Sequence, residues 1–393
     1  MIVTLTLNPS LDRTLALDSL RRGEVLRATS VRIDPGGKGV NVTRVLRAFG
    51  VDSHAVIPCA GPDGEELARL LQNAGVPVTE VQVAGWTRSN ITLAEADGRV
   101  TKVNAPGGAL TGQEVALLAE AVLERCVSQN AANAGTANGA AANGGVASGG
   151  TANTGTANGG ASASGGFANG GASASGGFAN GGASASGGFA NGGMPNSGAS
   201  NTGVSWAVLS GSLPPGVPDD VYASLTAQFA EHGVRVAVDT SGAALLAAVD
   251  AGPDLIKPNR QELAAAVGTP LNSIGEVVAA AEKLCSRGVK AVLASLGADG
   301  TVLVDGSGAV FGTAEAIEPV STVGAGDALL AGFLAAGGQG PEALIEAMAW
   351  ARAAVGLPGS QMPGPPDVVR EGIRVVRDPG GKPAGALHLA DNG

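Results

Sequence analysis

The sequence predicts an α/β fold, in which helices cover a mostly parallel sheet. Short apolar runs alternate along the chain with stretches of helical periodicity, the pattern of repeated strand–helix units. Most of these runs end in polar residues or glycine, as expected where ligands bind beyond the carboxyl ends of parallel strands. The expected strands are 2–7, 55–60, 206–210, 235–239, 255–257 and 291–296, and the expected helices include 64–74, 113–126, 221–232, 274–286 and 341–355.

Two other stretches, 13–33 and 90–104, do not fit this alternation of strands and helices. Apolar and polar residues alternate in both of them, as in antiparallel strands that bury one face. The pattern predicts antiparallel strands in both stretches.

The composition changes completely between 127 and 203, where no residue is charged and Gly, Ala, Ser, Asn and Thr dominate. A short repeat within it places Phe167, Phe178 and Phe189 at equal spacing. Such a segment buries too little apolar surface to offset the entropy of ordering it, which predicts a flexible insert, although stacking into a small solenoid or self-association stays open. We therefore expect one domain formed by 1–126 and 204–376, a flexible insert at 127–203 and a flexible tail at 377–393.

Charge and cysteine content narrow the class of protein. The net charge of −10 argues against a nucleic-acid surface and against binding to anionic membranes. The three cysteines and three histidines are widely scattered, so neither a disulfide framework nor a zinc site is predicted. We expect a cytoplasmic protein with reduced thiols, since no apolar run is long enough to span a bilayer and the first residues resemble a strand rather than a leader peptide.

The most informative motif is Ser321-Thr322-Val323-Gly324-Ala325-Gly326-Asp327, which precedes an apolar run of helical character at 328–334. A glycine turn at a helix N-terminus gathers free N–H groups and the positive end of the helix dipole around an anion. A carboxylate at Asp327 would repel that anion unless it takes a proton from an attacking hydroxyl. The combination points to phosphoryl transfer.

Another glycine turn, Pro35-Gly36-Gly37-Lys38-Gly39, is the first of the two in chain order, and it also opens onto a helical pattern at 40–46. It is not a Walker A loop, because glycine rather than Ser or Thr follows the lysine, and it does not match the dinucleotide fingerprint in its usual context. A lysine between two glycines has the backbone room and the charge to meet a phosphate.

Together the two turns resemble the signatures of the PfkB (ribokinase-like) family of sugar kinases. Further similar segments occur in the family's order at 4–12, 87–90, 210–216, 257–262 and 295–297. The resemblance implies a ribokinase-like three-layer α/β/α sandwich with a mostly parallel sheet and a small β lid, the lid being the two stretches 13–33 and 90–104. It is closest to the phosphofructokinase-like branch, and within it to the 1-phosphofructokinases.

The resemblance also assigns roles to residues of the acceptor side. Asp327 would be the catalytic base, and the N–H groups of Gly324, Ala325 and Gly326 would stabilise the transferred phosphoryl group. The sugar hydroxyls would meet Asp12 and Asn41, near the backbone of Gly36 and Gly37. The substrate's own phosphate would meet Lys38 and Arg88, with help from Ser212.

On the donor side the resemblance implies ATP and Mg²⁺. The expected ATP contacts are Lys257, Asn259, Ser295, Gly297, Gly324 and Gly326, with the segment 353–363 near the adenine. Asn259 and Glu262 match the family's N-x-x-E element, which would act on Mg²⁺ through water. An ordinary acidic residue in the first turn of a helix is an equally open interpretation of Glu262.

The activity implied is ATP-dependent phosphorylation of the 6-hydroxyl of D-fructose 1-phosphate, because the Gly-Gly-Lys-Gly turn and the segments 87–90 and 102–107 resemble that branch. The 6-phosphofructokinase and tagatose-6-phosphate kinase alternatives stay open, since sequence spacing does not fix where the substrate's phosphate lies. A sugar-phosphate sensor without catalysis is a further alternative, which the intact motif around Asp327 disfavours. The family also implies a homodimer formed through the lid.

Overall fold

The computed structural model describes residues 1–142 and 205–379. The chain divides into two compact units, one formed by Met1–Ala137 with Ala199–Gly393 and the other by Asn138–Gly198. Most of the second unit lies outside the described residues, as do the phenylalanine repeat of the expected insert and residues 380–393 of the expected tail.

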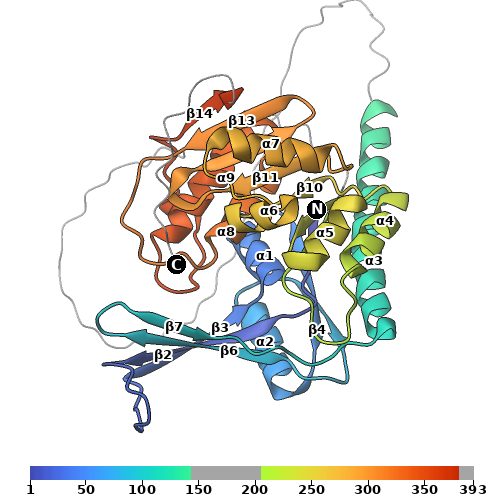
Figure 1. Cartoon of the computed structure of the whole chain (residues 1–393). Coiled ribbons are helices and arrows are strands. Elements are labelled where there is room, and N and C mark those ends of the chain that lie inside the picture. The colour runs from blue at the N-terminus through green and yellow to red at the C-terminus, as the bar shows by residue number, and fades with distance from the viewer. Residues whose placement is uncertain (143–204, 380–393) are drawn as a thin grey trace, which may run out of the picture. The chain divides into compact units, whose positions relative to one another are not determined.

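A large sheet organises the first unit (Figure 1), and within the described residues it has ten strands in the order β14-β13-β12-β11-β10-β9-β8-β1-β4-β5. All pairings from β11 to β5 are parallel, while β12, β13 and β14 extend one edge in antiparallel fashion. The mostly parallel sheet is therefore confirmed. The strands are β1 Ile2–Leu5, β4 Ser53–Cys59, β5 Val78–Gln82, β8 Trp206–Ser210, β9 Arg235–Asp239, β10 Leu255–Ile256, β11 Ala291–Ser295, β12 Thr301–Asp305, β13 Gly308–Thr313 and β14 Arg374–Arg377.

Helices cover both faces of this sheet, because its central strands are apolar on both sides. Ala207 and Leu209 of β8 pack into the core under α3–α7, whereas Trp206 and Val208 pack into the core under α1, α8 and α9. The three-layer α/β/α arrangement is thus confirmed. The helices are α1 Lys38–Ala48, α2 Gly61–Asn73, α3 Gly112–Ala142, α4 Val221–Glu231, α5 Gly242–Asp250, α6 Arg260–Val267, α7 Ile274–Cys285, α8 Ala325–Ala335 and α9 Gly340–Val355.

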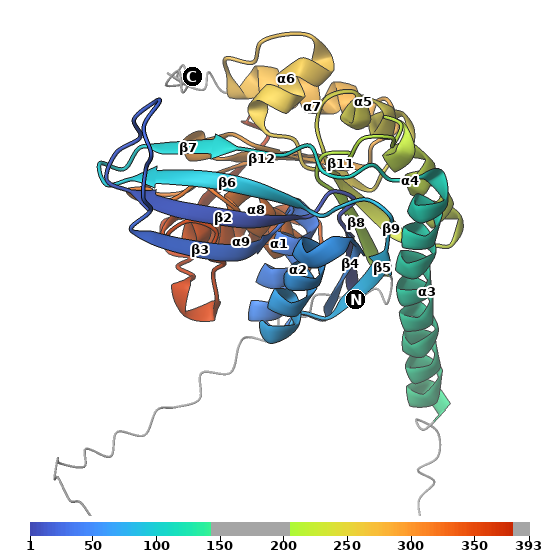
Figure 2. The same cartoon turned by 90° about the horizontal axis from the view of Figure 1, so that it is seen from below.

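A second sheet, in the order β3-β2-β6-β7, forms the expected lid (Figure 2). Its strands are β2 Ser10–Leu17, β3 Ser30–Gly36, β6 Arg88–Glu95 and β7 Val100–Val103. The β2–β3 and β6–β7 pairs are antiparallel, as the sequence predicts, but β2 pairs with β6 in parallel. The parallel pairing follows from the topology, since β2 and β6 come after β1 and β5, which run in the same direction in the large sheet.

The boundary predicted between the domain and the insert after Cys126 is wrong, because helix α3 continues beyond it. The helix runs past Cys126 to Ala142, so residues 127–142, which were assigned to the flexible insert, are helical. This stretch is rich in alanine and lacks proline, and extending an existing helix costs far less than starting one. At the other end of the insert, Ser205 Oγ donates a hydrogen bond of 3.2 Å to the carbonyl of Cys126, so the two sides of the segment 127–204 are in contact.

No helix in the described part of the chain combines the length and the hydropathy needed to cross a membrane.

Candidate active site

The N-terminus of α8 follows a glycine turn with the geometry that the sequence predicts for binding an anion. Gly324, the residue before the helix, has φ 79°, a left-handed conformation that favours glycine. The Ala325 N–H makes a long hydrogen bond of 3.4 Å to the Thr322 carbonyl, whereas the N–H groups of Gly324, Gly326 and Asp327 have no acceptor among the described residues. Free donors at a helix N-terminus are available to a phosphoryl group.

Asp327 lies buried in the first turn of α8, where its carboxylate faces α1. Asn41 Nδ2 donates a hydrogen bond of 2.8 Å to Asp327 Oδ2. Burial, reinforced by the negative charge of Asp239, raises the pKa of Asp327 to about 7, against the opposing effects of Asn41 and the two nearby lysines. A carboxyl that titrates near neutral pH suits a general base.

Asp239, at the end of β9, joins the two lysines of the site. Lys38 Nζ lies 2.7 Å from Asp239 Oδ1, and Lys257 Nζ lies 3.2 Å from Asp239 Oδ2. Burial disfavours the charged form of this enclosed carboxyl, but the lysines outweigh it and lower its pKa. Burial likewise opposes the charge of Lys38, yet Asp239 prevails and the pKa of Lys38 is raised.

Asp239 was not among the candidate site residues from the sequence, which gave only its position at the end of an expected strand. The contact with Lys38 joins segments 201 residues apart, and no local pattern records it.

The sugar-side candidates Asp12 and Gly36 lie on the neighbouring strands β2 and β3, where Ser10 is paired with Gly36 and Asp12 with Asp34. A Cβ at Gly36 would collide with the Asp12 carboxylate, so only glycine fits there. Asp12 Oδ1 accepts hydrogen bonds of 2.8 Å from Ser10 and 3.0 Å from Asn90. Burial nevertheless raises its pKa. The sequence analysis did not assign a role to Ser10 or single out Asn90, although both lie within the family-like segments.

The first glycine turn, at 35–39, is equally crowded. Gly37 has φ 116°, and a Cβ there would approach the Thr6 methyl group to 2.9 Å. The next residue, Lys38, begins α1, which carries Asn41 one turn later. Local backbone geometry therefore brings Lys38 and Asn41 to the same end of α1.

Arg88, the first residue of β6, lies near Asp12. Its Nη1 donates to the Ala105 carbonyl at 3.0 Å, while its buried Nε has no partner among the described residues. Burial lowers the pKa of Arg88, and the charge of Asp12 opposes that shift. Ser212 is bonded instead to Asn8 Nδ2 at 3.4 Å, and in the described contacts it joins neither Arg88 nor Lys38.

Asn259 and Glu262 form the N-terminal cap of α6. The Asn259 side chain accepts from the Glu262 N–H, and Glu262 Oε2 accepts from the Asn259 N–H at 2.9 Å. The other carboxylate oxygen of Glu262 lies 4.0 Å from Lys38 Nζ. Within 1–142 and 205–379, no three His, Cys, Asp or Glu side chains gather into a metal site.

The remaining donor-side candidates lie at the carboxyl ends of β10 and β11. Ser295 ends β11 and forms an isolated parallel bridge with Asn259, and Gly297 (φ 65°) begins the short 3₁₀ turn Gly297–Asp299. Lys257 follows β10, and a Cβ at Gly326 would lie 3.3 Å from its Nζ. These contacts bring Lys257 next to the glycine turn before α8.

A cavity of about 230 Å³ touches the segment 353–363 that was expected near the adenine. Most of its lining is apolar, and Asp367 and Arg352 add polar groups. Pockets for small organic ligands commonly have this mixture of apolar surface and a few polar groups. The lining residues are Ile317, Arg352, Ala353, Gly356, Leu357, Asp367 and Val369.

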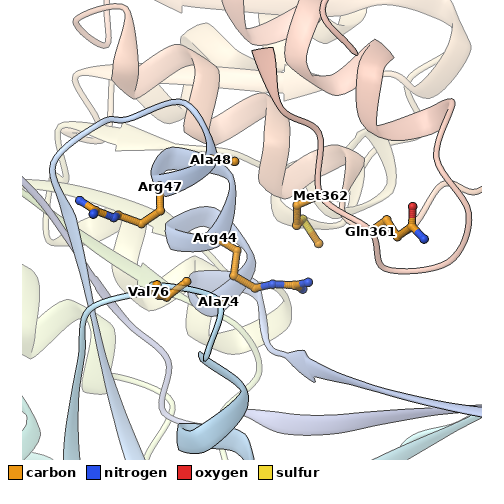
Figure 3. Close-up of a pocket in the computed structure, with 8 residues that line it drawn as sticks. Arg44, Arg47, Ala48, Ala74, Val76, Gln361 and Met362 are labelled. Carbon is orange, nitrogen blue, oxygen red and sulfur yellow. The ribbon is translucent and has the colours of Figure 1, made fainter. Parts of the chain in front are cut away.

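A larger cavity of about 400 Å³ lies at the far end of α1 (Figure 3), and its lining includes Gln361 and Met362 from the segment 353–363 that was expected near the adenine. The Arg44 side chain extends toward the segment with Gln361 and Met362, whereas Arg47 points the opposite way. Arg44 Nη1 is already engaged by the carbonyls of Pro35 and Ser360 and by Asn41 Oδ1. Arg44 therefore braces the first glycine turn.

A buried carboxylate of near-neutral pKa beside free helix N–H groups, at the carboxyl ends of a parallel sheet, defines a phosphotransferase with an alcohol acceptor. The family model described as pfkB family carbohydrate kinase matches residues 5–132 and 203–367, and the chain belongs to this family.

Among characterised relatives, the chain is 32% identical to a 1-phosphofructokinase of Xanthomonas campestris pv. campestris over 339 residues, covering 85% of this chain and 83% of the relative. It is 30% identical to the ATP-dependent 6-phosphofructokinase isozyme 2 of Escherichia coli, covering 84% and 83%. The crystal structure of Escherichia coli phosphofructokinase-2 in complex with potassium superimposes with a TM-score of 0.70 at 29% identity, covering 93% of this chain and 96% of that one.

Proposed function

We propose that the protein is an ATP-dependent 1-phosphofructokinase, which phosphorylates the 6-hydroxyl of D-fructose 1-phosphate to give D-fructose 1,6-bisphosphate and ADP. The observation that carries the proposal is the Asn41–Asp327 pair at the N-terminus of α8, beside Lys38 of the first glycine turn. The similarity to the Xanthomonas 1-phosphofructokinase supports this choice of substrate.

In the proposed reaction the ionised Asp327 carboxylate takes the proton of the 6-hydroxyl. The hydroxyl oxygen forms a bond to the γ-phosphorus while the bond from that phosphorus to the β–γ bridging oxygen breaks, and ADP leaves. The N–H groups of Gly324, Ala325 and Gly326 stabilise the charge on the transferred group, those of Gly324 and Gly326 being unpaired before it arrives.

The sugar is held in this proposal by Asp12 and Asn41 over the backbone of Gly36 and Gly37. Lys38 and Arg88 bind the 1-phosphate, with Ser212 nearby. Lys38 can serve both Asp239 and a phosphate, because an ammonium has three donors. Arg88 has an Nε without a partner in the part of the chain that the structure describes, and this Nε is available for the same purpose.

The nucleotide extends in the opposite direction, along Lys257, Ser295, Gly297, Gly324 and Gly326, with its base in the 230 Å³ cavity. Mg²⁺ bound with ATP would contact Asn259 and Glu262 through water and would neutralise phosphate charge. The capping bonds of α6 leave one Glu262 oxygen for this role.

A 6-phosphofructokinase is the second candidate, because the Escherichia coli 6-phosphofructokinase isozyme 2 is nearly as similar in sequence. Tagatose-6-phosphate kinase activity is the third. The test is ATP-dependent turnover of purified protein with fructose 1-phosphate, fructose 6-phosphate and tagatose 6-phosphate side by side. The highest kcat/KM on fructose 1-phosphate, abolished by Asp327→Ala, is expected. Preference for a 6-phosphate would select an alternative, and no turnover on any of the three would favour a sensor.

We also propose that the protein is a homodimer joined through its lids. Val31, Val100 and Val103 of the lid strands β3 and β7 are more than half exposed, which favours a protein partner on this sheet. Light scattering of the wild type and of Val103→Asp would test it, the dimer being lost in the variant. A monomeric wild type would contradict the proposal.

A cytoplasmic location completes the proposal. Cys59, Cys126 and Cys285 are free thiols, as expected in a reducing compartment. Fractionation of cells that express the tagged protein would test it.

A further inference from the structure

Three polar side chains form a closed ring of hydrogen bonds on the side of the lid sheet that faces α2. Arg13 Nη2 lies 2.9 Å from Asp63 Oδ1, and Arg13 Nε donates to Ser89 Oγ at 3.1 Å. Ser89 Oγ donates in turn to Asp63 Oδ2 at 2.8 Å. The ring thus connects β2, β6 and α2, three elements that are not consecutive in the chain.

The ring and the sugar-side candidates occupy opposite faces of the same two strands. In the register of β2 and β6, Ser10 pairs with Arg88 and Asp12 pairs with Asn90. Side chains alternate between the faces of a strand, so Arg13 and Ser89, each adjacent in sequence to one of these residues, point the other way, toward Asp63. A shift of either strand at the ring must therefore move Asp12 or Arg88.

Helix α2 provides a firm support for this ring. Thr87, just before β6, exchanges two hydrogen bonds with Ala60, just before α2: its N–H donates to the Ala60 carbonyl at 3.2 Å, and its Oγ1 accepts from the Ala60 N–H at 3.3 Å. A Cβ at Gly64 would lie 2.8 Å from Thr87 Oγ1, so the first turn of α2 packs directly against the start of β6. Asp63 lies within that turn, where the helix dipole favours its charge.

We propose that Asp63 is a positioning residue for the sugar phosphate: by holding Arg13 and Ser89 it fixes β2 and β6 relative to each other, and so fixes Asp12 against Arg88. The inference rests on the proposed function, in which these two residues bind the sugar and its phosphate. Asp63 itself touches no substrate. Its effect should therefore appear in the binding of the sugar phosphate and not in the binding of ATP.

Helix α2 also carries a matched control. Glu66, one turn after Asp63, forms an exposed ion pair with Arg69. Its charge attracts Arg13, but among the described residues it makes no hydrogen bond or ion pair with the lid. Partly exposed ion pairs contribute little to stability, so removing either pair should leave the fold intact. Only the loss of Asp63 should alter the site.

The experiment compares Asp63→Asn and Glu66→Gln with the wild type, using the sugar phosphate that the wild type turns over best. For Asp63→Asn we expect KM for the sugar phosphate to rise about tenfold, because small displacements of anchoring groups weaken binding strongly. KM for ATP and the Tm should stay at wild-type values, and Glu66→Gln should behave as wild type throughout.

A third variant, Arg13→Lys, keeps the charge but loses the fixed fork of the guanidinium, in which Nη2 reaches Asp63 while Nε reaches Ser89. It should raise the same KM, and the double variant Arg13→Lys/Asp63→Asn should add little to the single changes, because both break one ring. An unchanged sugar-phosphate KM in Asp63→Asn would overturn the inference, as would equal rises in both KM values with a lowered Tm. A wild type inactive on all three sugar phosphates would instead overturn the proposed function.

Discussion

Asn41 Nδ2 donates a hydrogen bond of 2.8 Å to Asp327 Oδ2, and the two residues lie 286 positions apart in the chain. The bond joins α1, which follows the first glycine turn, to α8, which follows the second. The protonation of the candidate base is therefore linked to the helix that would hold the sugar. Four of the predictions below follow from the geometry around these two turns.

Replacing Asp327 by Asn should remove the base while keeping its shape and an oxygen for Asn41. We expect kcat to fall by about 10²–10⁴-fold, the usual contribution of a general base, with little change in either KM. A coupled assay for ADP release measures it. A kcat within tenfold of the wild type would exclude Asp327 as the base.

The pH dependence of kcat/KM should report the ionisation of Asp327. The base acts in its ionised form, so activity should fall as the pH drops below about 7, the raised pKa of this carboxyl, and level off above it. Asn41→Ala removes a hydrogen bond that lowers this pKa, so the acid limb should move to higher pH. Asp239→Asn removes a negative charge that raises the pKa of Asp327, so the acid limb of this variant should move to lower pH. Shifts of the same sign in both variants would contradict this assignment.

Asp327→Asn should also make the protein more stable at alkaline pH. Because folding raises the pKa of Asp327 from 3.8 to about 7, the proton is held more tightly in the folded state, and stability is lost as the pH rises from about 4 to 7. Asn avoids that loss, so the variant should gain roughly 1–4 kcal/mol in its free energy of unfolding at pH 8. At pH 4 the gain should nearly vanish. Urea unfolding at both pH values measures the difference, and a variant less stable at pH 8 would be inconsistent with a strained carboxylate.

Gly36→Ala should weaken sugar binding specifically. The new Cβ would meet the Asp12 carboxylate and push it away from Ser10 and Asn90. We expect KM for the sugar phosphate to rise about tenfold or more, with KM for ATP unchanged. Gly112→Ala is a suitable control, since a Cβ there meets nothing within 4 Å. Equal effects of the two substitutions would refute the crowding argument.

Replacing most of the chain between Cys126 and Ser205, including the C-terminal half of α3, by a short linker should leave the kinase intact. Cys126 and Ser205 are in hydrogen-bond contact, so about four glycine and serine residues can replace 128–203 without stretching the chain. We expect kcat/KM within about twofold of the wild type, because loop-closure entropy changes slowly with length. A loss of turnover in a folded variant would give this segment a part in catalysis.

The strands of the central sheet could be predicted well, because each is a local apolar run. Trp206–Ser210 and Arg235–Asp239 begin and end where the sequence indicates. The antiparallel edge, β12–β14, was not anticipated, because its strands come together in the fold without helices between them. The parallel pairing of β2 with β6 could not be predicted from local patterns either. It depends on where the chain leaves the large sheet before each of the two strands.

The candidate site likewise combines features that the local sequence predicts with contacts that only the fold brings together. The two glycine turns were predictable, because their conformations depend on neighbouring residues. Asp239 and Asp63 were not assigned, because their roles come from contacts with lysine, arginine and serine side chains far away in the sequence. For Glu262 the capping interpretation is the one seen in the described contacts, and its part at Mg²⁺ stays a prediction.

The position of Asp239 between Lys38 and Lys257 has a thermodynamic consequence. One enclosed carboxylate is the shared counter-ion of Lys38, which we propose to bind the sugar phosphate, and Lys257, which we propose to bind the nucleotide. When an anion draws one lysine away, the Asp239 carboxylate depends more on the other lysine. The free energy of binding one substrate therefore depends on whether the other substrate is already bound. By linkage the effect is reciprocal, and each substrate should change the affinity for the other by the same factor.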